Sequence, residues 1–471
     1  MRLQGFLSRV QVETIHHQAL RVLSELGVRV EHEELRQRLE GLGARCDHAA
    51  EMVRFSPTLI ERLIAAAPKR PINDEAPPQV SGRVGIYACR YLDAETNALL
   101  PFNEERLAFY IGLARTLKYV AGISMLGVPF VPEDIPAPYL PLAERLFAWK
   151  YGIAPGGSVL STGLCESLLE MYAWRAQTTG KRLGEVFRAV GYLISPLRLA
   201  RPECEQLLFF AQRGLHMSIG HLPSQGGTAP VTLAGAIVLA LAEQLFLFLL
   251  QRALWEDASL SLGSDVSTID MRTGALCYGR PEQQRINAAF ADLARFYGCT
   301  CYGHTGNADA HLPGYEAAAQ KATGALFTAL ATGHGSVSEG LLSVDEVCSP
   351  VQMVLDDDLV GSLKALLAEI RVGEEECAVE EILRVGPGGT YLSTDHTARR
   401  FRDELFQPRT WSAGLTSAWQ ATGGKVEVDR ARDFVRDFAR RFTPTPALTA
   451  DDEEALRAII ARAIRQSTAR C

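Results

Sequence analysis

The sequence predicts an α/β fold: a TIM-type (β/α)8 barrel with a helical cap before it and a helical extension after it. From about residue 103 to residue 337, helical patterns alternate with short apolar segments, which gives roughly seven or eight strand–helix units. The clearest unit comprises an apolar segment at 215–220, a glycine-rich loop, an apolar helix from about 230 to 255 and a second apolar segment at 259–265. No GxGxxG or GxxxxGKS/T motif follows a strand, which disfavours an open nucleotide-binding sheet.

Residues 1–80 are expected to form the cap. Apolar residues recur at helical spacing over 8–26, and Gly27 is a natural stop. Further helices are expected at 33–42 and 56–67, so this segment is predicted to be helical and compact. After it, short apolar pairs on either side of a turn-rich stretch within 82–101 predict a hairpin or a pair of short strands.

The barrel is expected to span residues 81–425. Its main predicted helices are 104–117, 140–151, 167–177, 202–212, 230–255, 281–297 and 314–332. Its main predicted strands are 119–126, 158–160, 187–194, 215–220, 259–265, 300–303 and 335–337. Because barrel enzymes keep their chemistry in the loops at the carboxyl ends of the strands, we expect the active site there, above all around the loop 221–228.

Residues 426–471 are expected to form a helical extension packed on the barrel. A helix is predicted at 429–442, and residues 451–465 have the pattern of a charged amphipathic helix. Such a helix is typical of a solvated face or a subunit contact, so a homo-oligomer is compatible with the sequence.

The composition excludes several function classes. The chain is 47% hydrophobic and 22% charged with a net charge of -7, and its basic residues are scattered, so no nucleic-acid partner is expected. Residues 231–250 are long enough to span a membrane, but Glu243 and Gln244 lie inside the stretch, so we predict a buried barrel helix and no membrane. The ten cysteines form no CxxC pair, and residues 1–12 show no signal pattern, so a reduced cytoplasmic protein is expected.

Four ordered motifs carry a family resemblance. They are the run from Ile15 to Val28, the segment from Gly226 to Gly235 with Ala242-Glu243 behind it, the stretch from Ser349 to Asp358, and Val385 to Leu392 followed by His396-Thr397. Together they resemble the trimethylamine methyltransferase superfamily, which includes glycine betaine methyltransferases without pyrrolysine. The resemblance implies a TIM barrel that moves a methyl group from a methylated amine to the cobalt of a separate corrinoid protein. It implies no tightly bound cofactor, because the corrinoid is supplied by that partner.

Every residue is a standard amino acid, although the trimethylamine enzymes of this superfamily carry pyrrolysine. Co(I) in a reduced corrinoid attacks a methyl carbon directly when the leaving nitrogen departs neutral. A quaternary ammonium compound meets this condition, because it leaves as a neutral tertiary amine. The expected substrate is therefore a quaternary amine such as a betaine, and the protein has to position and desolvate it.

The residues expected to bind such a cation are aromatics and carboxylates near strand ends. The aromatic candidates are Tyr192, Tyr302, Tyr278 and Trp255, and the carboxylate candidates are Asp265, Glu339 and Asp309. Aromatic faces attract an ammonium group by cation–π interaction, and a carboxylate adds Coulomb attraction. Ordinary packing is the alternative for each aromatic, and a salt bridge is the alternative for each carboxylate.

Histidines and backbone amides supply further candidates. His304 lies on a glycine-flanked loop after a strand and is expected to face cobalt or substrate, as a catalytic residue together with Asp265 and Glu339; His221 also follows a strand. The amides of Gly226, Gly227 and Thr228 precede a helix, where they would bind a substrate carboxylate. A structural histidine and a tight turn into the helix are the respective alternatives.

The loop at 386–397 is expected near the barrel rim, where Tyr391 and His396 would face the pocket or the docking surface. Cys299 and Cys301 lie on one face of a strand near His304, but their spacing does not match the common zinc motifs, and no metal site is predicted.

Two other functions stay open at this point: a non-catalytic or regulatory barrel that binds a betaine-like solute, and a barrel lyase or hydrolase. A hydrolase would need a general base beside a nucleophile or metal, and the sequence shows no motif for either.

Overall fold

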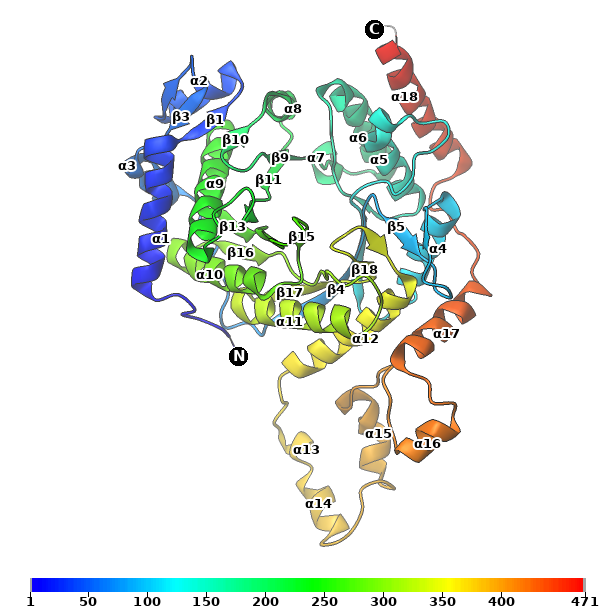
Figure 1. Cartoon of the computed structure of the whole chain (residues 1–471). Helices are drawn as coiled ribbons and strands as arrows, with labels where there is room; N and C mark the ends of the chain where they lie inside the picture. The colour runs from blue at the N-terminus through cyan, green and yellow to red at the C-terminus, as the bar shows by residue number, and fades with distance from the viewer. Residues whose placement is uncertain (1, 469–471) are drawn as a thin grey trace.

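The computed structural model describes residues 2–468 and shows an α/β architecture in which helices surround short parallel strands (Figure 1). The parallel strands are β4 Gln79–Ile86, β7 Val120–Met125, β8 Ala154–Pro155, β9 Val190–Leu193, β11 Ser218–His221, β13 Ser261–Ser264, β16 Thr300–Gly303 and β17 His334–Ser338. The helices around them are α4 Glu104–Ala114, α5 Leu140–Lys150, α6 Cys165–Thr179, α7 Leu183–Val186, α8 Arg201–Ala211, α9 Leu233–Leu254, α10 Pro281–Tyr297, α11 Tyr315–Thr332 and α12 Pro350–Leu367. The predicted alternation of parallel strands and helices is thus confirmed.

The strands pair in three groups. β17, β4, β7 and β8 form one parallel sheet, β9 pairs with β11, and β13 pairs with β16. A single parallel bridge from Ser158 to Val190 connects the first two groups, where the sequence predicted a strand at 158–160. Backbone ladders among residues 2–468 do not join the three groups into one closed sheet, so the barrel itself stays a prediction.

The two faces of these strands differ strongly in residue size. On β4, Val80, Val84 and Ile86 are buried, whereas Arg83 between them is exposed, so the alternate positions face the inside of the ring. Many inward positions of the other strands hold small residues, among them Gly122, Ser124, Ser218, Gly220, Ser261, Gly263, Ser336 and Ser338, and two further inward positions hold Tyr192 and Tyr302. A typical TIM barrel fills this space with branched apolar side chains. Here the inside is left open to polar groups.

Helix α9 is apolar on all sides because it is a core helix. Thr232 caps its start by accepting a hydrogen bond from the amide of Gly235. It is the one described helix long and apolar enough to span a membrane, and 78% of its apolar window is buried inside the protein. Glu243 and Gln244, at 0% and 6% exposure, bind the ends of neighbouring strands, which explains two polar residues in this stretch.

Helix α12 was not among the predicted helices. Ser349 caps it and Pro350 occupies its first turn. Its consecutive aspartates are buried because each has a partner: Asp356 pairs with Lys321, Asp357 accepts from backbone amides before β7, and Asp358 accepts from Thr410. This run of acids obscured the helical pattern.

The N-terminal segment contains a sheet as well as helices. Its helices are α1 Arg9–Arg21, α2 Glu33–Leu42 and α3 Pro57–Ala66, and its strands are β1 Val28–Val30, β2 Arg45–Asp47 and β3 Met52–Arg54. Strand β1 also pairs in parallel with β10 (Arg198–Leu199), which ties the segment to the main body. The predicted hairpin within 82–101 is shifted, because β4 joins the parallel sheet and the hairpin consists of β5 (Arg90–Leu92) and β6 (Leu99–Leu100).

Short additional strands lie at one end of the ring. They are β12 Ser224–Gln225, β14 Ser267–Ile269, β15 Leu276–Cys277, β18 Leu341–Leu342 and β19 Val347–Cys348. β14 pairs with β12 and β15, and β19 pairs with β18 and β5. They all follow parallel strands, so they lie at the carboxyl ends of the ring.

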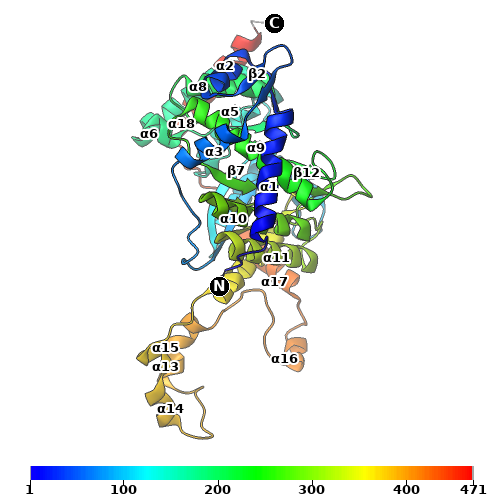
Figure 2. The ribbon, with the colours of Figure 1, turned by 90° about the vertical axis from the view of Figure 1, so that its left-hand side faces the viewer.

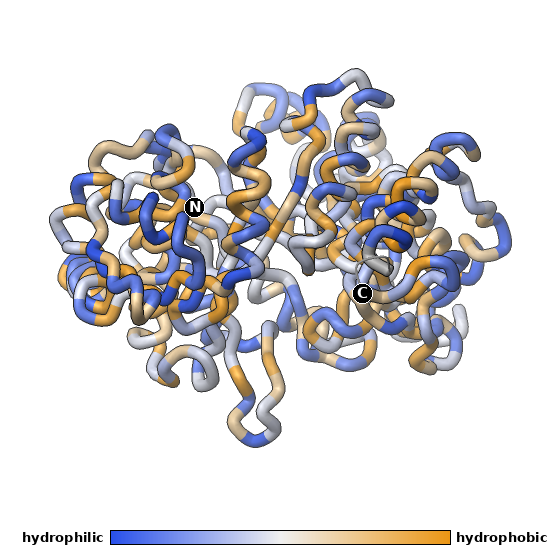
Figure 3. The backbone as a smooth tube through the Cα atoms, turned by 90° about the horizontal axis from the view of Figure 1, so that it is seen from above, coloured by the Kyte–Doolittle hydropathy of each residue, from blue (hydrophilic) through white to orange (hydrophobic). Residues whose placement is uncertain are grey.

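The C-terminal helices α17 (Glu427–Ala439) and α18 (Ala450–Thr468) pack on the body, α17 against α4 and α12, and α18 against α5 and α6. Between them and α12, the helices α13 (Glu374–Cys377), α14 (Val379–Val385) and α15 (Asp395–Glu404) form an arm, residues 369–405, that projects away from the ring (Figures 1 and 2). The short helix α16 (Thr416–Ala421) lies outside the body as well. Seen from above, the tube alternates between hydrophilic and hydrophobic stretches along the outer helices (Figure 3).

Candidate functional site

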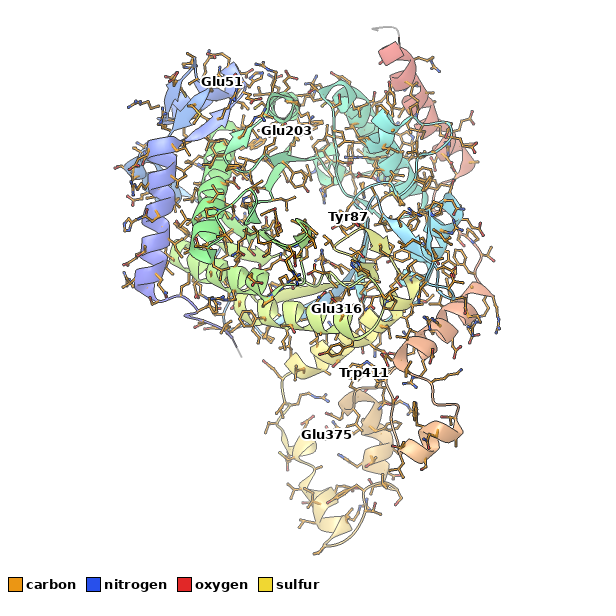
Figure 4. All side chains as sticks on the ribbon, viewed as in Figure 1. Glu51, Tyr87, Glu203, Glu316, Glu375 and Trp411 are labelled. Carbon is orange, nitrogen blue, oxygen red and sulfur yellow. The ribbon has the colours of Figure 1, made fainter. Side chains whose placement is uncertain are left out.

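Four tyrosines and two aspartates gather at the carboxyl ends of the strands. We call this group the rim cluster; it consists of Tyr87, Tyr192, Tyr278, Tyr302, Asp265 and Asp345. The negative charge of Asp265 acts on Tyr192, Tyr278 and Tyr302, and that of Asp345 acts on Tyr87 and Tyr278. Figure 4 shows Tyr87 within the central region that the helices surround. The cluster therefore combines aromatic faces with two carboxylates in one electrostatic environment.

Tyr302 lies across the neighbouring strand because that strand has a glycine at the matching position. Gly263 is the register partner of Tyr302, and a Cβ atom there would lie 1.9 Å from the Cζ atom of the tyrosine. The Tyr302 hydroxyl donates a hydrogen bond to Asp265 at 3.3 Å. Burial of the phenol, and then the charge of Asp265, raise the pKa of Tyr302, so the hydroxyl stays protonated. Half of its surface, 52%, still faces the central space.

Tyr192 has an equivalent place on the other pair of strands. Gly220 is its register partner on β11, and a Cβ atom there would approach the Tyr192 ring to 3.0 Å. The side chain is 51% exposed, and its pKa is raised by burial and by the charge of Asp265. Two tyrosine faces are thus held open towards the interior by two glycines.

His304 is held neutral beside the cluster. Its Nδ1 atom lies 2.9 Å from Nε2 of Gln283, and its ring meets Tyr278 edge-on at a centroid distance of 4.4 Å. Burial lowers the pKa of His304, although the charges of Asp265 and Asp345 act in the opposite direction. A neutral imidazole held by an amide is suited to orienting a ligand rather than to donating a proton.

Asp345 is a site residue that the sequence analysis missed. It lies in the loop between β18 and β19, where Ser343 and Val344 both adopt positive φ angles of 50° and 69°. Such a conformation costs about 1–3 kcal/mol for each residue, and hydrogen bonds from their amides to Ala310 and Ala308 hold it. Burial raises the pKa of Asp345 above its usual value. Nothing in the local sequence signals a β-branched residue at positive φ, so the position of Asp345 could not be foreseen.

His221 lies behind the cluster in a buried polar network. Its Nδ1 atom is 2.8 Å from Glu243 and its Nε2 atom is 2.9 Å from the amide nitrogen of Gln244. Gln244 in turn accepts from the amide of Gly263, so this network spans the gap between β11 and β13. A cavity of about 210 Å³ lies in this gap and is lined by His221, Gln244 and Tyr302 among others.

The glycine-rich loop uses two of the three expected amides in its own turn. The amide of Gly226 donates to the carbonyl of Ala229 at 3.0 Å, and that of Gly227 donates to Ser224 at 2.8 Å. The Thr228 hydroxyl accepts from the amide of Ser224. The expected anion site is therefore corrected at Gly226 and Gly227, whose amides bond within the turn, and only the amide of Thr228 stays a candidate.

Glu339 is placed on the outer side of the strand layer, not at the cluster. It is 0% exposed, and its carboxyl lies against Gly82 of β4, where a Cβ atom would be 1.5 Å from Oε1. Burial, followed by the charges of Asp356 and Asp357, raises its pKa to about 9. The predicted catalytic place of Glu339 is therefore corrected, because its side chain turns towards α12 and away from the cluster.

The structure separates other candidates from the cluster. Tyr391 and His396 lie in the arm, which projects away from the ring, so their predicted place near the rim is corrected. Trp255 stacks on His216 at 4.3 Å. Asp309 binds the amides of Tyr278 and Gly279 at 2.6 and 3.0 Å, so it positions a cluster residue from behind.

Sequence comparison with known proteins gives matches over most of the chain. The family model described as trimethylamine methyltransferase matches residues 2–87 and 158–468. The trimethylamine methyltransferase of Methanosarcina barkeri is 26% identical over 474 residues, covering 96% of this chain and 94% of that protein. The glycine betaine methyltransferase of Desulfitobacterium hafniense is 25% identical over 479 residues, covering 97% of each chain. The solved monomethylamine methyltransferase of M. barkeri aligns over 92% of this chain and 93% of that one, with a TM-score of 0.45 and 13% identity.

Proposed function

Because this chain belongs to the trimethylamine methyltransferase family and is a methyltransferase, we propose that it transfers a methyl group from a quaternary ammonium compound, such as a betaine, to the Co(I) of a corrinoid carried by a separate protein. The relatives named above act, by their names, on trimethylamine and on glycine betaine. The rim cluster is the observation that carries the choice of a quaternary cation.

The cluster suits a substrate that carries a positive charge. Tyr192 and Tyr302 turn open faces to the interior, and each face is worth about 0.5–2 kcal/mol to a nearby ammonium group. Asp265 and Asp345 supply negative charge in a site of reduced polarity, where Coulomb attraction exceeds its value in water. A neutral tertiary amine gains neither contribution in full.

The reaction needs no acid from the protein. The N–CH3 bond breaks and its electron pair stays on nitrogen, which leaves as a neutral tertiary amine, while the electron pair of Co(I) forms the new bond to the methyl carbon. The task of the chain is to hold the methyl group in line and to exclude water. The neutral state of His304 and the protonated state of Tyr302 agree with this requirement.

We also propose that the eight parallel strands close into a TIM-type barrel. The protein is further proposed to be cytoplasmic. Gln244 spans the gap between β11 and β13, and the amide of Ser338 donates to Gly306, just after β16, at 3.0 Å. These contacts bring the three strand groups together around the rim cluster. The nine described cysteines are all free, as is usual in a reducing compartment.

Alanine at Gly263 is expected to weaken binding of the quaternary amine at least about tenfold, because its Cβ atom would displace the Tyr302 ring from its place over β13. Isothermal titration of the purified protein measures the change. Gly122→Ala is the matched control, since a Cβ atom at this inward glycine meets nothing within 4 Å, and it should bind as the parent does. Equal affinity in all three proteins would remove Tyr302 from the binding site.

Methyl transfer tests the proposed activity itself. Purified protein is incubated with reduced cobalamin and a panel of quaternary amines, and formation of methylcobalamin is followed by absorbance. We expect transfer from at least one quaternary amine and none from trimethylamine. Transfer from trimethylamine alone would contradict the substrate class, and binding without any transfer would favour a betaine-binding barrel.

A further inference from the structure

The arm has no core of its own. Between Ala368 and Arg430 only Thr394 and Thr410 are buried, and both are polar. The arm nevertheless carries large apolar side chains that are mostly exposed to solvent. The exposed fractions are 90% for Ile370, 82% for Val372, 69% for Leu383 and 89% for Leu392. Exposed apolar patches of this kind mark surfaces that another molecule covers.

The clearest apolar ridge lies on helix α14. Val379, Ile382 and Leu383 are 53%, 52% and 69% exposed, and their spacing puts them on one side of the helix. The neighbouring residues are acidic: five glutamates occur within 374–381, of which Glu375 and Glu376 pair with Arg400 and Glu381 pairs with Arg384. Figure 4 labels one of them, Glu375, far from the ring.

A complementary surface exists on the body of the same chain. An apolar groove of about 280 Å³ lies between α1, α9 and α10. Its lining consists of Phe6, Leu7, Gln11, Thr14, Ile15, Leu233, Ala234, Ile237, Arg285 and Ala289. Arg285 is the only charged residue in this lining, and it has no ion pair among residues 2–468. Two exposed apolar side chains lie on the elements around this groove: Val10 on α1 is 71% exposed, and Val231 just before α9 is 64% exposed.

We propose that the ridge of α14 docks into this groove on a second copy of the chain. The ridge and the groove are both apolar, and Glu380, which has no ion pair among residues 2–468, matches the cationic Arg285. Two arms packed on each other would instead bring two acidic segments together. The arm projects away from the ring, so its own groove is out of reach in this conformation.

A permanent partner fits these observations better than a transient one. A corrinoid protein has to reach the rim cluster and leave again, which would uncover the arm in each cycle, whereas a second copy is present from synthesis onwards. Exchange of an arm between identical chains gives a closed two-fold assembly, in which each copy supplies one ridge and one groove.

Sedimentation analysis of two variants tests the arrangement. Leu383→Asp places a charge on the ridge, and Ala234→Asp places one in the groove, in the first turn of α9, where an acidic residue is compatible with the helix. We expect the parent protein to be assembled at micromolar concentration and each variant to dissociate at least about tenfold more readily. Leu99→Asp, at a 52% exposed position on the β5–β6 hairpin, is the matched control and should assemble as the parent does.

Mixing distinguishes this arrangement from arm-to-arm pairing. An equimolar mixture of Leu383→Asp and Ala234→Asp chains contains one intact ridge and one intact groove, so we expect one-to-one heterodimers that neither variant forms alone. A monomeric parent, or an Ala234→Asp variant that assembles as the parent does, would overturn the proposal. Circular dichroism of each variant confirms that it is folded, so that loss of assembly is not loss of structure.

Discussion

Asparagine in place of Asp265 is expected to lower kcat/KM for a quaternary amine about 10- to 100-fold. The substitution removes a negative charge that acts on Tyr192, Tyr278 and Tyr302 but keeps an acceptor for the Tyr302 hydroxyl. Interactions with a charged partner in a partly buried site contribute about 1.5–3 kcal/mol, which corresponds to this range. Steady-state methyl transfer with saturating Co(I) acceptor measures the effect.

The control for Asp265→Asn is a ligand rather than a second variant. A compound in which carbon replaces the quaternary nitrogen has the same shape without the charge, and its inhibition constant should be equal in the parent and in Asp265→Asn. If the variant loses affinity for both ligands equally, Asp265 supports the structure of the site and does not bind the cation.

Glutamine in place of Glu339 is expected to make the protein more stable at alkaline pH. Burial raises the pKa of Glu339 to about 9, whereas an unfolded glutamate titrates near pH 4.5. The folded protein therefore keeps a proton that the unfolded chain releases above pH 4.5, and stability falls as the pH rises from there to about 9. One proton corresponds to about 1.4 kcal/mol per pH unit, so between pH 5.5 and 8.5 the variant should gain roughly 2–4 kcal/mol relative to the parent.

Urea unfolding at a series of pH values gives this comparison. Glu316→Gln, at an exposed position on α11 (Figure 4), is the matched control and should follow the pH dependence of the parent. Parallel pH dependences for Glu339→Gln and the parent would show that Glu339 is ionised inside the fold, against the unpartnered carboxyl oxygens of the structure.

The elements with strong local signals were predictable from the sequence. Helices α2 and α10 begin and end where their patterns predicted, because acidic residues or proline open them and a left-handed glycine closes each one. Helix α9 was recognised as a core helix from Glu243 and Gln244, and the structure supplies the reason, since both bind strand ends.

The candidate site was predictable only in part. Asp265, Tyr192 and Tyr302 follow or end parallel strands, and the rule that strand ends meet at one rim places them in one cluster with Tyr278; their roles in binding stay predictions. Asp345 was missed because its place depends on a strained loop held by distant carbonyl groups.

The errors at Gly226, Glu339 and Tyr391 have a common cause. The amide of Gly226 is used within its own turn, the side chain of Glu339 turns to the outer face, and the arm that carries Tyr391 leaves the body. Each of these features depends on tertiary contacts, which cannot be predicted from local motifs and residue spacing.

The fate of a labelled methyl group tests the central claim most directly. Purified protein, reduced cobalamin and a quaternary amine whose N-methyl groups are labelled with 13C are combined without oxygen. The products are followed by NMR. The account predicts that the label appears on cobalt in equal amount to the tertiary amine released. Label recovered as methanol, or no tertiary amine at all, would contradict methyl transfer from a cation held at the rim cluster.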